Sequence, residues 1–178
     1  MKKISLIASF LILSLVANRS FAQTANLNIT LSDVLSFTVN QPAALNVNFD
    51  SETKYNTGIT ALATDHISVT SSRGYVIKAK AGTVTGTAAL APGSVKITSS
   101  IGTSNTGNTT GLVFQSDVVL PASAGTPATI LTAANSSWDG TNSTNKFNIS
   151  YLIGSGGVFA GKATGVNVIP VTYTVTQP

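Results

Sequence analysis

The chain has no cysteine, one histidine and one tryptophan among its 178 residues. Without cysteine it can form neither a disulfide framework nor a thiolate nucleophile. The histidine, His66, follows Asp65, a pair more typical of a turn than of a catalytic triad, and Gly154–Gly157 lacks the third glycine and the following helix of a nucleotide-binding loop. Asp50 and Glu52 are the closest acidic pair, too few ligands for a metal site. We therefore expect no enzymatic activity, no cofactor and no metal.

Charge is scarce as well, with 10 lysines and arginines and 6 acidic residues in the full sequence. Three of the basic residues lie in the first 22 positions, so seven basic groups face six acidic groups in the remainder. Binding of nucleic acid requires a clustered basic face. Lys78 and Lys80 are the nearest approach to one, and their alternation is typical of a solvated strand face. We expect no nucleic-acid partner.

Only the N-terminus carries a long apolar run. Two lysines precede Ile4–Ala17, and Ser20–Ala22 has the small-x-small form that signal peptidase accepts. The run has 14 residues, whereas a spanning helix needs roughly 20. These features predict a secretory signal peptide over residues 1–22 and a single mature domain over residues 23–178 without a membrane span. The expected route is through the periplasm to the cell surface or the extracellular space.

The mature region is rich in Thr, Ser, Asn, Gly, Ala and Val, which favours strands joined by tight turns. Its longest pattern is Ala25–Val39, where apolar residues keep one parity and therefore share one face of an extended chain. Ser32-Asp33 interrupts the pattern, so we expect two strands or one bent strand. The alternating apolar residues are Leu27, Ile29, Leu31, Leu35, Phe37 and Val39. The last three are expected in the domain's own core.

Further alternating runs bring the count to about eight to ten short strands. Two of them flank the Ser71–Gly74 turn and predict a hairpin. Together the runs predict an all-β fold, a single antiparallel Ig-like β-sandwich, with a small β-barrel as the alternative. The other expected strands lie at Leu45–Phe49, Ile67–Val69, Tyr75–Ala79, Val95–Thr98, Leu112–Phe114, Asp117–Leu120, Ala128–Ala133, Phe147–Ile153 and Val166–Thr176.

Trp138 lies in the polar segment Asn135–Asn142. An exposed indole can stack on a sugar ring while Asp139 and Asn142 bind its hydroxyl groups. The alternative is that the indole folds down and caps the open end of the sandwich.

The exported, low-charge chain, its alternating N-terminal segment and its final strand Val171–Thr176 with Tyr173 resemble the secreted subunits of chaperone–usher fimbriae and the related spore-coat-U-like proteins. The resemblance implies an Ig-like sandwich that lacks one strand, which a neighbouring subunit's N-terminal strand supplies. It also implies related subunits, a periplasmic chaperone and an outer-membrane usher as partners. Many fimbrial subunits carry a disulfide, and this chain has none. The donor segment would be residues 23–32, with Ala25, Leu27, Ile29 and Leu31 as the inserted side chains.

Two functions follow as hypotheses. The first is a non-enzymatic structural subunit of a cell-surface filament or coat, linked by N-terminal strand donation. The second is a monomeric carbohydrate- or surface-binding module that uses Trp138, Asp139 and Asn142. For the N-terminal segment itself, the alternative to donation is that Leu27–Leu31 pairs within its own domain as an ordinary first strand.

Overall fold

The computed structural model describes residues 27–40 and 44–178, so the expected signal peptide and Ala25 lie outside the described residues. The chain divides into two units, Met1–Ser32 and Asp33–Pro178. The boundary falls at the Ser32-Asp33 interruption of the alternating pattern. Residues 27–34 form no strand. All regular structure in the described residues belongs to the Asp33–Pro178 unit, which is all-β with antiparallel strand pairing throughout.

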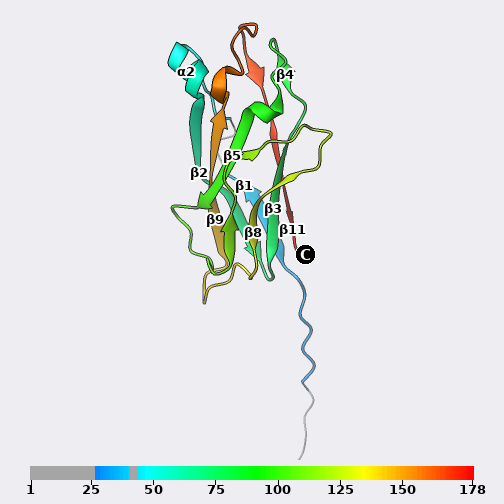
Figure 1. Cartoon of the computed structure of the whole chain (residues 1–178). Coiled ribbons are helices and arrows are strands. Elements are labelled where there is room, and N and C mark those ends of the chain that lie inside the picture. Colours follow the sequence, from blue (N-terminus) through cyan, green and yellow to red (C-terminus); the bar gives the residue numbers. More distant parts are fainter. Residues whose placement is uncertain (1–26, 41–43) are drawn as a thin grey trace, which may run out of the picture. The chain divides into compact units, whose positions relative to one another are not determined.

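A five-stranded sheet and a four-stranded sheet make up most of this unit (Figure 1). The larger sheet has the order β1 (Leu35–Val39), β2 (Ile59–Ser71), β9 (Thr144–Ile153), β5 (Val95–Ile101) and β7 (Val118–Val119). The smaller sheet has the order β11 (Val171–Thr176), β3 (Tyr75–Ala81), β8 (Ala128–Ala133) and β6 (Leu112–Phe114).

Short elements complete the unit. Strands β10 (Asn167–Val168) and β4 (Thr85–Gly86) form a separate two-stranded ribbon. The helical elements are α2 (Glu52–Thr57), η1 (Pro92–Ser94) and η2 (Ser155–Gly157). Among the described residues no helix has the length and apolar character needed to cross a membrane.

The core lies between the two large sheets. Every second residue of β3 is buried, and the same alternation runs through most of β9, as the period-two patterns predicted. The largest fully buried apolar side chains are Tyr75, Phe147, Ile67, Ile77, Ile97, Leu120, Ile130, Leu131 and Ile149. The rings of Phe147 and Phe114 lie 6.1 Å apart and help to join the sheets.

The hairpin expected around Ser71–Gly74 is wrong. Both strands form, but β2 pairs with β1 and β9, whereas β3 pairs with β11 and β8. The turn therefore carries the chain from one sheet to the other. Gly74 lies close to the end of β8, because a Cβ atom at Gly74 would be 2.8 Å from the carbonyl oxygen of Ala133. Alternation and a short turn are common to hairpins and such crossings, so the sequence pattern did not separate them.

The strand expected at Leu45–Phe49 is also absent, although the side chains still alternate in burial. Leu45 packs against the core. The ring of Phe49 lies 5.4 Å from that of Tyr55 in α2 and 5.2 Å from that of Phe159. The apolar residues of this segment thus pack against the core and against α2, and the segment joins no sheet.

Candidate functional site

Strand β1 forms one edge of the larger sheet, and its inward face is partly uncovered. Leu35, Phe37 and Val39 lie directly opposite residues of β2 that are fully buried, so they point to the same inward side. Nevertheless Leu35 is 40% exposed and Val39 45% exposed, and only Phe37 packs against the core. The expectation that all three are core residues is therefore correct for Phe37 alone.

Strand β11 forms the corresponding edge of the smaller sheet. In the described part of the chain it pairs only with β3, so its other side presents free backbone donors and acceptors. Val171, Tyr173 and Val175 point inward and are half-buried. The intervening threonines point outward and are exposed.

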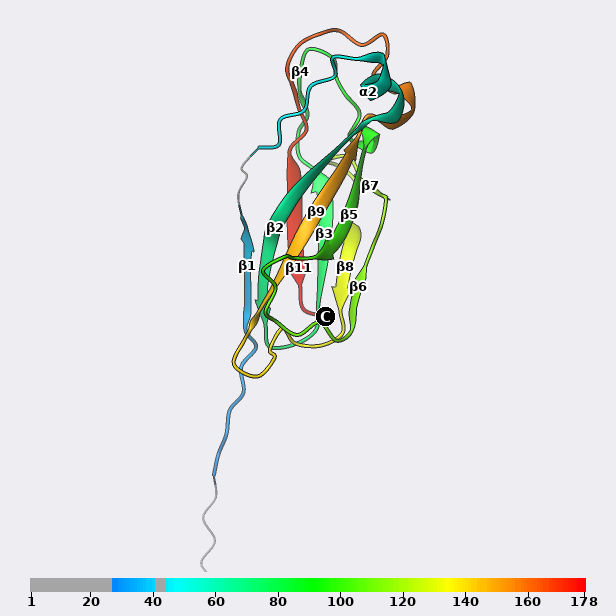
Figure 2. The ribbon, with the colours of Figure 1, turned by 90° about the vertical axis from the view of Figure 1, so that its left-hand side faces the viewer.

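The two edges are not in line. The ring of Tyr173 in β11 lies 5.8 Å from that of His66 in β2, and its hydroxyl is hydrogen-bonded to that of Tyr151 in β9. Strand β11 therefore stacks across from β2 and β9, and β1 lies about one strand spacing of 4.7–4.9 Å further out. Figure 2 shows β1 at the left margin of the front sheet, with β11 behind its neighbours. Among the described residues, no strand of the smaller sheet lies across from β1.

We call this feature the open edge. It consists of the inward-facing residues of β1 and β11, namely Leu35, Phe37, Val39, Val171, Tyr173 and Val175. All six are apolar or aromatic, and a single added strand with alternating apolar side chains would cover them.

His66 lies at the inner side of the open edge. It is 6% exposed and its ring packs edge-on against Tyr151 and Tyr173. Its Nδ1 atom has no hydrogen-bond partner among the described residues. Burial lowers the pKa of His66 and raises the pKa values of both tyrosines.

A β-bulge places this histidine. The pairing of β2 with β9 shifts register between Ala63 and Ile67, and Asp65 has a φ of 48°. The Asp65 carboxylate accepts a hydrogen bond of 3.1 Å from the backbone N–H of Ser104. Burial opposes this effect, but the hydrogen bonds from Ser104 keep the pKa of Asp65 below its ordinary value. Asp65 and His66 are thus bulge residues within a strand, not the turn pair expected from the sequence.

Polar bonds close the open edge at one end. The Gln177 side-chain amide donates to the carbonyl oxygen of Val34 at 2.9 Å and to Ser71 Oγ at 2.8 Å. Arg73 donates to Asp33 at 2.9 Å. We call this end of the unit the Arg73 end. Strand β11 begins at the opposite end, where the N–H of Gly82 donates to the carbonyl oxygen of Pro170, and we call it the Pro170 end.

The expected donor residues are strongly exposed. Leu27, Ile29 and Leu31 are 82%, 71% and 90% exposed, and they belong to the Met1–Ser32 unit. Three large apolar side chains on alternate positions are an unusual exposed feature of a monomer and typically mark a binding segment.

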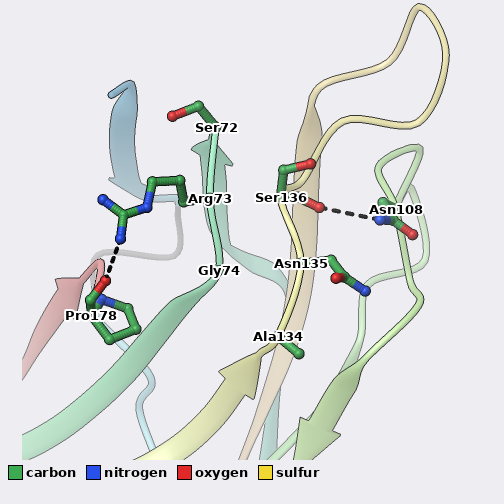
Figure 3. A pocket seen from close by; sticks show the side chains of 8 residues that line it. All are labelled: Ser72, Arg73, Gly74, Asn108, Ala134, Asn135, Ser136 and Pro178. Atoms are coloured by element: carbon green, nitrogen blue, oxygen red, sulfur yellow. Dashed lines mark hydrogen bonds between the residues drawn. The ribbon is translucent and has the colours of Figure 1, made fainter. Parts of the chain in front are cut away.

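The sugar-contact candidates come together in a tight turn. Backbone hydrogen bonds in both directions join Asp139 to Asn142, and Trp138 precedes them with its side chain partly exposed. A polar cavity of about 620 Å³ also lies at the Arg73 end (Figure 3). It is lined by Ser72, Arg73, Gly74, Asn108, Ala134, Asn135, Ser136 and Pro178, and Trp138 is not among these residues.

In the ranges that the structure describes, no group of three or more His, Cys, Asp or Glu residues could hold a metal ion. Comparison with models of known protein families and with curated proteins finds no match for this chain.

Proposed function

We propose that this chain is a non-enzymatic structural subunit of a cell-surface filament or coat, whose copies are linked by donation of the N-terminal strand. The observation that carries the proposal is that the chain has both an exposed apolar segment and an uncovered apolar sheet edge. An exposed segment has apolar side chains at Leu27, Ile29 and Leu31, and an open edge has three inward-facing residues at the same spacing on each flanking strand. Strand addition of this kind gains backbone hydrogen bonds and buries alternate side chains.

The strand order supports an Ig-like sandwich that lacks one strand. In the immunoglobulin fold, strands A, B, E and D form one sheet and C, F and G the other. The order β1-β2-β9-β5 corresponds to A-B-E-D, and β3 beside β11 corresponds to C beside F. Strand G would lie on the free side of β11, where the described residues supply no strand. Under this proposal, the open edge is the position of the missing strand.

Burial of three large side chains would contribute to the stability of the link. Each contributes roughly 1.5–3 kcal/mol, which gives on the order of 5–9 kcal/mol before the cost of ordering the segment. Each copy would accept one strand and donate another. Such a head-to-tail contact does not close on itself unless its rotation forms a ring, so it builds an open chain.

The expected export signal and the open edge together favour assembly outside the inner membrane. An unfilled apolar edge is an aggregation hazard during transit. A periplasmic chaperone that covers it, and an outer-membrane usher that releases it for assembly, are the partners that this function requires.

Deletion of Gln23–Ser32 tests the link. Because the described part of this segment is exposed and lies outside the β-unit, we expect the remaining chain to keep its circular dichroism spectrum and unfolding midpoint. Size-exclusion chromatography should show that high-mass species disappear. A Gly/Ser segment of equal length in place of Gln23–Ser32 controls for chain length and should behave in the same way. Unfolding of either variant would mean that the segment completes its own domain, and strand donation would be wrong.

A second function is favoured by the position of the Trp138 turn, which places Asp139 and Asn142 beside a partly exposed indole. As a carbohydrate-binding module, the protein should change its tryptophan emission as oligosaccharides are added, and Trp138 is the only source of that signal. The change should be lost in an Asp139→Ala, Asn142→Ala variant. Constant emission across a panel of glycans would reject this function.

A further inference from the structure

We propose that the polar cavity at the Arg73 end binds one uncharged sugar residue, through the free side-chain oxygen atoms of Asn135 and Ser136. The cavity volume of about 620 Å³ lies within the range of roughly 300–1,000 Å³ that is usual for small-molecule sites. None of the six open-edge residues is among the described residues that line it, so the proposal goes beyond strand donation. It also assigns sugar binding to residues other than those of the Trp138 turn.

The cavity forms where four segments of the chain meet. They are the turn between β2 and β3, the loop that follows β5, the loop that follows β8 and the residues that follow β11. Figure 3 shows Arg73 and Pro178 on one side of the cavity, with Asn108, Asn135 and Ser136 on the other. Polar side chains from distant parts of the sequence therefore face one space.

The charge at this cavity is already balanced. Among the described residues that line it, Arg73 alone has a charged side chain. Its guanidinium group donates to the carboxylate of Asp33 at 2.9 Å and to the backbone oxygen of Pro178 at 2.8 Å. An anionic ligand would have to compete with Asp33 for these charge-assisted hydrogen bonds. An uncharged ligand meets no such competition, so the cavity favours one without net charge.

Two oxygen atoms in the cavity wall remain available for a ligand. Asn135 donates from Nδ2 to the carbonyl oxygen of Thr110 at 3.1 Å, and its Oδ1 atom has no partner in the described part of the chain. The backbone oxygen of Ser136 accepts from Asn108 Nδ2 at 3.3 Å, while the Ser136 hydroxyl makes no hydrogen bond within the described ranges. An apolar ligand would leave both oxygen atoms without partners, which is costly once water is excluded.

A sugar residue matches these groups. Each sugar hydroxyl both donates and accepts hydrogen bonds, as the Ser136 hydroxyl does, whereas the Asn135 oxygen accepts only. The methyl group of Ala134 and the ring of Pro178 can contact the C–H groups of a sugar ring. No aromatic side chain is among the described lining residues, so a nucleobase would lack a ring on which to stack. The cavity is open to solvent, and a longer glycan can therefore extend from it.

Buried polar side chains hold the wall that carries Asn108 and Ser136. Ser137 is fully buried, and its Oγ atom accepts from the N–H of Ser71 at 2.7 Å. The carbonyl oxygen of Ser137 accepts from the N–H of Asn108 at 3.0 Å. Asn145, which is also fully buried, donates from Nδ2 to the carbonyl oxygen of Asn108 at 3.0 Å. The wall is thus fixed before a ligand arrives, which reduces the entropic cost of binding.

Saturation-transfer difference NMR on residues 23–178 tests the site with methyl glycosides of neutral hexoses and N-acetylhexosamines, and with glucuronate as the anionic comparison. We expect transfer to at least one neutral glycoside and weaker transfer to glucuronate. The variant Asn135→Ala, Ser136→Ala removes both free oxygen atoms and should raise the Kd about tenfold, because two neutral hydrogen bonds are lost. The variant Ala134→Gln should also weaken binding, because it fills part of the cavity and removes no side-chain hydrogen bond.

The variant Asp139→Ala, Asn142→Ala is the matched control, since it alters the Trp138 turn and leaves the cavity lining intact. Its Kd should equal that of the unaltered chain, and thermal unfolding should show that each variant is folded. Self-association should be the same in all of them, so failure of strand donation and failure of sugar binding are distinguishable. Absence of transfer to every neutral glycoside, a preference for glucuronate, or an affinity that both cavity variants retain would overturn the proposal.

Discussion

Ile29→Asp is expected to abolish self-association, whereas Thr30→Asp is expected to leave it nearly unchanged. Ile29 is the middle one of the three apolar side chains of the proposed donor strand, and Thr30 points to the opposite face of that strand. Loss of the buried isoleucine removes roughly 1.5–3 kcal/mol, which alone weakens association by at least about tenfold. A carboxylate placed in an apolar site without a partner weakens it further.

The two variants carry the same added charge on neighbouring residues, so their difference isolates the inward position. Analytical ultracentrifugation of the 23–178 chain gives the association constant, and thermal unfolding reports on the β-unit. We expect equal unfolding midpoints, because Ile29 is exposed and lies outside that unit. Equal loss of association in both variants would indicate a general charge effect and would contradict the proposed strand insertion.

Much of the fold was predictable, because the apolar residues that alternate in the sequence are the residues that are buried in the strands. The strands expected at Leu112–Phe114 and Ala128–Ala133 match β6 and β8, and the antiparallel all-β class is confirmed. Pairing partners were not predictable from the same signal. Alternation shows which face of a strand is buried, but at the Ser71–Gly74 turn it did not show that the next strand joins the other sheet.

The candidate site was likewise predictable only in part. The apolar parity of Leu27, Ile29 and Leu31 is visible in the sequence, and so is the interruption at Ser32-Asp33. The open edge is not, because Leu35 and Val39 have the same pattern as core residues. Their exposure depends on β11 lying across from β2 and β9, which is a long-range arrangement. The role of His66 was missed for a similar reason, since only the bulge in β2 brings it between two tyrosines.

Acidification should weaken the β-unit through His66. The groups that face its ring are Tyr151 from β9 and Tyr173 from β11, while the inward residues of β1 carry no charge. The neighbouring carboxylate of Asp65 is directed at the N–H of Ser104 instead. No anion lies among these neighbours. Burial lowers the pKa of His66 from its ordinary value of 6.5, although a hydrogen bond with the backbone of Asn40 opposes the shift. The unfolded chain therefore binds the proton more readily, and stability falls as the pH drops below about 6.5.

This effect can be isolated because His66 is the only histidine, and histidine is the one side chain whose ordinary pKa lies between pH 5 and 8. Denaturant unfolding of residues 23–178 at pH 7.5 and pH 5.5 should show lower stability at the acidic pH. His66→Phe retains an edge-on aromatic contact and His66→Gln retains a polar side chain, and neither can be protonated in this range. Both should remove the pH dependence, even where one of them lowers stability at both pH values. Under the proposed linkage, association should weaken in the same pH window, because the donor strand would lie beside β11, whose Tyr173 packs against His66. A wild-type stability that does not change with pH, or a slope that persists in both variants, would assign the histidine a packing role only.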